Sequence, residues 1–288
     1  MAESLLNCEN PKEADVVILA ANYDRTSSFG KGADKGPEAI RECLDWQIEF
    51  YDRVSGWSPV EHKKIAWHDP GDLSQLSPEA MVQKLSQVCA EFNEKFVLLV
   101  GGEHSVTNGP LLAHAAQADD ITIVQIDAHA DLREDDSDYN EKPHGKFAHC
   151  AVMKRGFDLG YKLVQVGLRA CSATERELFS NPRVRAFEWG HVQPEISEIL
   201  KAVSTDKVYL TIDVDGFDPA VMPATGTPVP GGLGWYYTIE LLRGLFKQHN
   251  VIGADVVEVA PRNGESLTEY SAAQLVYSII GLKFADVR

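Results

Sequence analysis

The sequence predicts a single α/β domain built on a mostly parallel sheet of about eight strands flanked by helices. Short apolar runs rich in β-branched residues alternate with stretches of helical length. Apolar runs without alternating polar residues are typical of strands that are buried on both faces, as in a parallel sheet. The 288 residues contain no repeat or linker that would divide them, so we expect one domain over residues 1–288.

The expected strands are eight apolar runs, and the expected helices lie between many of them. The strands are residues 16–20, 64–67, 95–100, 121–126, 163–166, 184–187, 208–212 and 252–259. The helices are residues 37–50, 77–93, 104–118, 194–203, 238–248 and 267–282. Two long polar segments, 132–147 and 217–235, interrupt this alternation. Because ligands of parallel α/β sheets bind beyond the carboxyl ends of strands, we expect the functional site near these two segments.

Composition and charge exclude several classes of function. Lys and Arg number 27 and Asp and Glu 43, which gives a net charge of −16. Such a charge disfavours nucleic acid and anionic membranes and attracts small cations. The sequence shows no membrane-spanning stretch and no secretory signal, and its five cysteines have no CxxC pairing. We therefore expect a cytoplasmic protein with no nucleic-acid or membrane partner.

Three predicted strands end in carboxylates and histidines. Strand 121–126 leads into a DAHAD segment, strand 208–212 into DVD, and strand 95–100 into GGEH. Side chains two residues apart on an extended chain point to the same side, so those of each motif should converge. The six candidate ligands are His104, Asp127, His129, Asp131, Asp213 and Asp215. We expect them to face one site.

Four carboxylates cannot share one site without compensating positive charge. Like charges raise one another's pKa, and burying them unpaired is costly. Two divalent cations would supply the four positive charges that four aspartates require. Oxygen ligands combined with imidazole suit manganese, with zinc, iron and nickel as alternatives. The sequence therefore predicts a site for two Mn²⁺ ions.

At these residues the sequence resembles the ureohydrolase family, the binuclear manganese enzymes that include arginase and agmatinase. Family-like motifs occur in order along nearly the whole chain, at residues 36–41, 101–105, 127–131, 213–219, 226–228 with 231–232, and 258–261. The resemblance implies an arginase-like fold, one ureohydrolase-like catalytic domain, and a homotrimer or homohexamer. It also implies that His104, Asp127, Asp131 and Asp213 serve one metal or bridge the pair, while His129 and Asp215 complete the other.

The resemblance assigns catalytic roles as well. Glu258 would bind the guanidinium group, and Asp131 would pass a proton to the departing amine. A histidine in the loop after the DAHAD segment would shuttle protons. We favour His149, because an aromatic and a small residue precede it as in agmatinases. His144, which resembles the arginase-style placement, remains the alternative for this shuttle or for substrate binding.

The loop after the DAHAD segment bears on the substrate. Residues 132–141 include five acids in ten residues, which favours a small cationic guanidino substrate over one that carries a carboxylate. Agmatine, cleaved to urea and the polyamine putrescine, fits best. Arg133 and Lys142 could instead hold a carboxylate, which leaves guanidinobutyrase, guanidinopropionase, arginase and formimidoylglutamase activities open. A catalytically idle metal-binding regulatory subunit is the alternative of another class.

Overall fold

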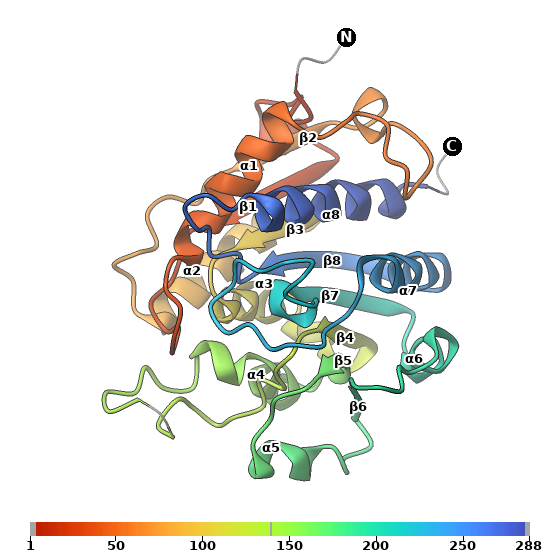
Figure 1. Ribbon diagram of the computed structural model, residues 1–288. Coiled ribbons are helices and arrows are strands. Elements are labelled where there is room, and N and C mark those ends of the chain that lie inside the picture. The colour runs from red at the N-terminus through yellow and green to blue at the C-terminus, as the bar shows by residue number, and fades with distance from the viewer. Residues whose placement is uncertain (1–3, 139, 286–288) are drawn as a thin grey trace.

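The computed structural model describes residues 4–138 and 140–285, and its centre is one eight-stranded sheet (Figure 1). The strand order is β2-β1-β3-β8-β7-β4-β5-β6, and every neighbouring pair is parallel. The strands are β1 (Val16–Ala21), β2 (Ile65–His68), β3 (Phe96–Gly101), β4 (Ile121–Ile126), β5 (Lys162–Leu168), β6 (Val184–Glu188), β7 (Lys207–Asp213) and β8 (Asn250–Val257). The predicted fold class is confirmed.

Strand β8 ends earlier than the sequence suggests. The apolar run predicts a strand to residue 259, but the structure ends it at Val257. Glu258 has a left-handed backbone, with φ of 66°, and its N–H donates to the carbonyl of Gly102 at 2.8 Å. The prediction was wrong at this end because Glu258 turns out of the strand instead of extending it.

Eight α-helices accompany the strands in the described part of the chain. They are α1 (Gly36–Trp46), α2 (Pro78–Glu91), α3 (Asn108–Ala113), α4 (Val152–Leu159), α5 (Ala173–Leu178), α6 (Ile196–Ala202), α7 (Trp235–Gln248) and α8 (Leu267–Lys283). The short helices α4 and α5 were not predicted. The helix expected over residues 104–118 is broken into α3 and two flanking 3₁₀ turns. Pro110 contributes to the break, because it has no N–H to donate to the carbonyl of Val106.

The helices cover both faces of the sheet. One core cluster joins α1, α6, α7 and α8 to one face, and two others join α2, α3 and α4 to the opposite face. Helices α1 and α8 pack side by side (Figure 1). All six residues of β1 are buried, which explains why the strands read as continuous apolar runs. No helix within residues 4–138 and 140–285 is long and apolar enough to cross a membrane.

The four central strands determine where the site lies. β3, β8, β7 and β4 are consecutive in the sheet, so their carboxyl ends meet along one edge. Neighbouring strands are about 4.8 Å apart, so side chains that follow them can touch. From β4 the chain continues to β5 and β6 on one side, and from β7 it continues to β8 on the other side. Open α/β sheets bind ligands at such a switch point.

Candidate metal centre and substrate pocket

The six candidate ligands converge at this edge of the sheet. His104 follows β3, and the DAHAD segment follows β4. Asp213 is the last residue of β7, and Asp215 lies in the 3₁₀ turn that follows β7. Ligand atoms of five of them form two groups, each with all atoms within 4.8 Å of one another, and the sixth, Asp131, lies 2.9 Å from Nδ1 of His104 without belonging to either group. The first group is His104, Asp127 and Asp213, and the second is Asp127, His129 and Asp215. The two groups share Asp127, so two adjacent cation positions would have one carboxylate in common.

His104 has a nitrogen aimed into the first group. Its Nδ1 lies 2.9 Å from Asp131, 3.2 Å from Asp127 and 3.6 Å from Asp213, yet makes no hydrogen bond of acceptable geometry. Its Nε2 lies 2.9 Å from the hydroxyl of Thr211, which holds the other side of the ring. A buried nitrogen that faces three carboxylates in this way is suited to bind a metal ion.

Asp127 faces both groups with different oxygens. Its Oδ2 points to His104, and its Oδ1 lies 3.6 Å from Nδ1 of His129. Asp215 Oδ2 lies 3.0 Å from the same nitrogen of His129 and accepts a hydrogen bond from Thr227 at 3.1 Å. Residues of both groups are therefore oriented by hydrogen bonds from outside the cluster.

The charge at this site is not balanced by the protein alone. Burial and the neighbouring Asp127 raise the pKa of Asp131 to about 7. Burial, Asp215 and Asp127 raise the pKa of Asp213 well above its usual value. Burial would lower the pKa of His129, but Asp215 and Asp127 overcome this effect and raise it to about 12. Two divalent cations would supply the charge that these carboxylates require, so the residues fit a two-metal site.

The DAHAD segment converges for a different reason than the sequence suggests. β4 ends at Ile126, so residues 127–131 do not continue the strand. Asp131 has a left-handed backbone with φ of 52°, and its carbonyl accepts hydrogen bonds from Met153 and Lys154. The first turn of α4 therefore holds the bend that turns Asp131 toward His104. In the described ranges, Asp131 and Glu258 are the two non-glycine residues with positive φ.

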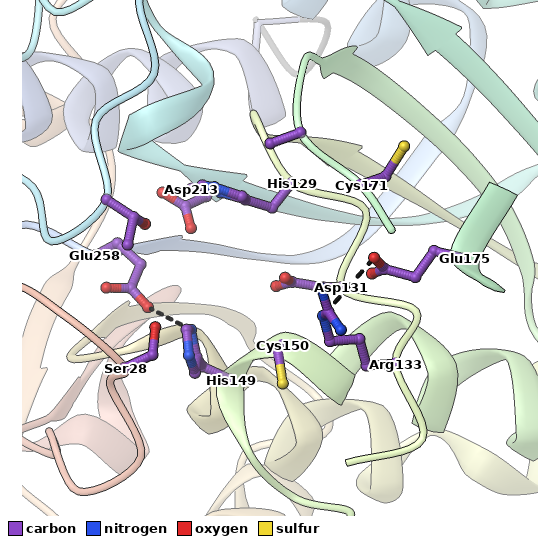
Figure 2. Close-up of a pocket in the computed structure, with 12 residues that line it drawn as sticks. Ser28, His129, Asp131, Arg133, His149, Cys150, Cys171, Glu175, Asp213 and Glu258 are labelled. Atoms are coloured by element: carbon purple, nitrogen blue, oxygen red, sulfur yellow. Dashed lines mark ion pairs between the residues drawn. The ribbon is translucent and has the colours of Figure 1, made fainter. Parts of the chain in front are cut away.

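A cavity of about 300 Å³ opens beside the cluster (Figure 2). His129, Asp131 and Asp213 contribute to its lining. Figure 2 shows Glu258 and His149 together on one side and the Arg133–Glu175 ion pair on the other. The cavity thus has the Glu258 carboxylate near the candidate metal ligands and the Arg133–Glu175 ion pair on its opposite side.

Glu258 is held close to the first group of ligands. Its Oε1 accepts a hydrogen bond from the backbone N–H of His104 at 2.8 Å. Burial and nearby Glu103 raise the pKa of Glu258 well above its usual value. A buried carboxylate in a cavity gains most from a cationic ligand, because the ligand supplies the missing countercharge.

The two loop histidines occupy different environments. His149 lines the cavity, with Nδ1 4.0 Å from Glu258 and Nε2 buried without a hydrogen-bond partner. The backbone N–H of His149 donates to the hydroxyl of Thr26, and that hydroxyl donates to the carboxylate of Glu103. Burial, with His129 and His104, lowers the pKa of His149 to about 4. His144 is not among the described residues that line the cavity, and both its N–H and its Nδ1 contact Asp136.

The opposite side of the cavity carries Arg133 and its acidic partners. Arg133 Nε lies 3.8 Å from the buried carboxylate of Glu175, and its Nη1 donates to Asp138. Glu175 also accepts hydrogen bonds from the N–H groups of Leu132 and Ser172. Lys142 is exposed and does not line the cavity. Of the two cationic side chains considered from the sequence, Arg133 therefore lines the cavity. It forms ion pairs with Glu175 and Asp138.

Sequence reasoning missed several residues around the site. Glu175 lines the cavity, and Gln125 and Gln165 are fully buried behind the cluster. Thr227, which also lines the cavity, lies in the motif 226–228 but was given no role. The two glutamines interrupt otherwise apolar strand runs, and a polar residue in such a run was the available signal. Glu175 had no comparable signal, because only the fold brings α5 to the pocket.

The comparisons with known proteins agree with this geometry. The model of the arginase family matches residues 14–281. The chain belongs to the arginase family. An N(1)-aminopropylagmatine ureohydrolase of Synechocystis sp. is 38% identical over 280 residues, which cover 93% of this chain and 89% of that protein. An agmatinase of Pyrococcus horikoshii is 32% identical over 282 residues, which cover 94% of this chain and 93% of that protein.

Solved structures agree as well. The agmatine ureohydrolase of Thermoplasma volcanium has a TM-score of 0.83 at 26% identity, covering 100% of this chain and 96% of that one. The resemblance seen in the sequence is thus confirmed. This arginase-family chain is a metal-dependent hydrolase of amidine C–N bonds, and the expected arginase-like fold is confirmed.

Proposed function

We propose that this enzyme hydrolyses the guanidinium group of a small linear cation, agmatine in the first instance, to urea and an amine. The observation that carries this proposal is the position of Glu258. It lies in the same cavity as His129, Asp131 and Asp213, and its carboxylate can bind a guanidinium beside the candidate metal positions. The whole chain would act as one catalytic domain.

Six residues would hold two Mn²⁺ ions: His104, Asp127, His129, Asp131, Asp213 and Asp215. The mixture of carboxylate oxygen and imidazole nitrogen supports manganese, and the shared Asp127 supports a pair of ions rather than one. Bound metal ions of this kind make water a stronger nucleophile near neutral pH.

The protein's own groups would handle orientation and proton transfer. Glu258 would hold the guanidinium so that its carbon faces the candidate metal ligands. Asp131 would take a proton from the attacking water and deliver it to the departing amine, since it lines the cavity next to these ligands. His149, with a free buried Nε2, would exchange protons between the cavity and solvent.

We expect the variants His149→Ala and His144→Ala to differ strongly. Loss of a group that relays protons should lower kcat by about 10²–10⁴-fold in His149→Ala. His144→Ala should keep kcat within about threefold, because His144 contacts Asp136 and not the cavity. Steady-state kinetics with agmatine measures both values. A larger loss of kcat in His144→Ala would transfer the shuttle role to His144.

The far side of the cavity bears on the rest of the substrate. Arg133 is accompanied there by Glu175 and Asp138, so these three side chains together favour an amine over a carboxylate. Agmatine and N(1)-aminopropylagmatine both end in an amine. The latter is the second candidate, supported by the 38% identical relative that carries its name.

A panel of guanidino compounds tests the proposed substrate class. We expect Mn²⁺-loaded protein to release urea from agmatine, N(1)-aminopropylagmatine or both, with little release from arginine, 4-guanidinobutyrate and 3-guanidinopropionate. Preference for a carboxylated compound would reject the amine proposal and would indicate that Arg133 leaves Glu175 to bind the carboxylate. Metal binding without turnover of any compound would favour an idle regulatory subunit.

We further propose a cytoplasmic homotrimer or homohexamer. Support comes from exposed apolar side chains around one groove, Tyr51, Tyr236, Leu267 and Tyr270, which a second copy of the chain would cover. Light scattering of the purified protein measures the oligomer, and a monomeric mass would reject this part of the proposal.

A further inference from the structure

Two buried glutamines lie directly behind the DAHAD segment. Gln125 in β4 and Gln165 in β5 are register partners on neighbouring strands, and each is 0% exposed. Other positions of the same face, such as Ile123 and Leu163, belong to an apolar cluster. An amide in such a place is costly unless its polar atoms are hydrogen-bonded.

The two amides form a directed chain of hydrogen bonds. Gln165 Nε2 donates to Gln125 Oε1 at 2.5 Å and to the carbonyl of Ala130 at 2.7 Å. Gln125 Nε2 donates to Asp127 Oδ2 at 2.6 Å and to the carbonyl of His129 at 3.3 Å. Because Gln165 supplies the donor to Gln125 Oε1, the amide of Gln125 must present its NH₂ group to Asp127.

We propose that Gln125 and Gln165 act in series as positioning residues for the metal-binding segment. The inference rests on the proposed role of Asp127 as the ligand shared by two Mn²⁺ ions. The segment lies beyond the end of β4, where backbone hydrogen bonds of Asp127 and Ala128 still join it to β5 and the residues that follow β5. The glutamines add side-chain hydrogen bonds to one carboxylate and two backbone carbonyls of the segment. Gln125 orients the Asp127 carboxylate so that Oδ2 faces His104 and Oδ1 faces His129. Gln165 touches no candidate ligand side chain; it fixes the direction of the Gln125 amide and also donates to the carbonyl of Ala130 within the segment.

A purely structural role would give a different pattern of effects. Apolar side chains of similar size could fill both positions, since the surroundings are apolar and replacing both partners of a buried hydrogen bond is nearly neutral. Replacement by methionine keeps the volume and removes the hydrogen bonds. The apo form of the double variant should therefore fold normally, while its metal binding should weaken.

The test is Mn²⁺ affinity of Gln125→Met, Gln165→Met and the double variant, measured by competition with a chelator. We expect each single variant to bind Mn²⁺ about 10–100-fold more weakly, the usual loss for partners of metal ligands. We expect the loss in the double variant to fall well short of the product of the single losses, because residues in series are not additive. Thermal unfolding of the apo double variant should have a midpoint close to that of wild type, whereas each single variant should unfold a few degrees lower because one buried amide loses its partner. If Gln125→Met does not fold, Gln165→Met and the double variant provide the test.

Thr122→Val is the matched control. Thr122 is also buried in β4, and its hydroxyl is hydrogen-bonded to Thr205 and does not contact the ligands. This variant should bind Mn²⁺ within about twofold of wild type. Wild-type affinity in Gln125→Met or Gln165→Met, or losses that multiply in the double variant, would overturn the inference while leaving the proposed function intact. A wild-type protein that binds no Mn²⁺ would overturn both.

Discussion

Asp127→Ala is expected to cause a loss of activity at least as large as that of any other single substitution in this protein. Asp127 belongs to both ligand groups, so its removal disrupts both cation positions. Bound metal ions contribute several kcal/mol of transition-state stabilisation, and losing roughly 3–5 kcal/mol of it corresponds to a fall in kcat/KM of roughly 10²–10⁴-fold. Urea release from agmatine and Mn²⁺ content after desalting, measured on the same preparation, give the two values.

Asp158→Ala is the control for this prediction. Asp158 is a partly exposed aspartate that pairs with Lys154 and Arg155 on α4. Its removal should leave Mn²⁺ content and turnover close to those of wild type. If Asp127→Ala retained two Mn²⁺ ions per chain, the assignment of Asp127 as the ligand shared by the two ions would be wrong.

Glu258→Gln is expected to lower kcat/KM for agmatine by roughly 10²–10³-fold without changing Mn²⁺ content. The glutamine keeps the shape of the side chain, and its carbonyl can still accept the hydrogen bond from His104 N–H. It lacks the negative charge that would pair with the guanidinium, and losing one partner of a buried charge pair costs about 2–5 kcal/mol. Steady-state kinetics and metal analysis together check the prediction.

The outcome of Glu258→Gln is informative in either direction. Glu198→Gln on the exposed surface of α6 is the control and should behave as wild type. A loss of Mn²⁺ from Glu258→Gln would indicate that Glu258 supports the metal site, and substrate binding would need another carboxylate. Unchanged kinetics would remove Glu258 from the proposed mechanism.

The fold class and the position of the candidate site could be predicted from the amino-acid sequence alone. Strands covered by helices on both faces must be apolar throughout, so their runs are visible without knowledge of the fold. In a parallel sheet the carboxyl ends of strands meet at one edge, so motifs that follow β3, β4 and β7 were bound to approach one another. The charge of four aspartates then required cations, whatever the details of their geometry.

The orientation of the individual site side chains depends on tertiary contacts. The left-handed backbones of Asp131 and Glu258 depend on contacts with Met153 and Gly102, which are distant in sequence. The positions of the two loop histidines likewise depend on partners outside the local pattern, Thr26 for His149 and Asp136 for His144. Local propensity cannot encode such contacts, because a strained backbone or a buried polar group is stable only where the surrounding fold supplies its partners.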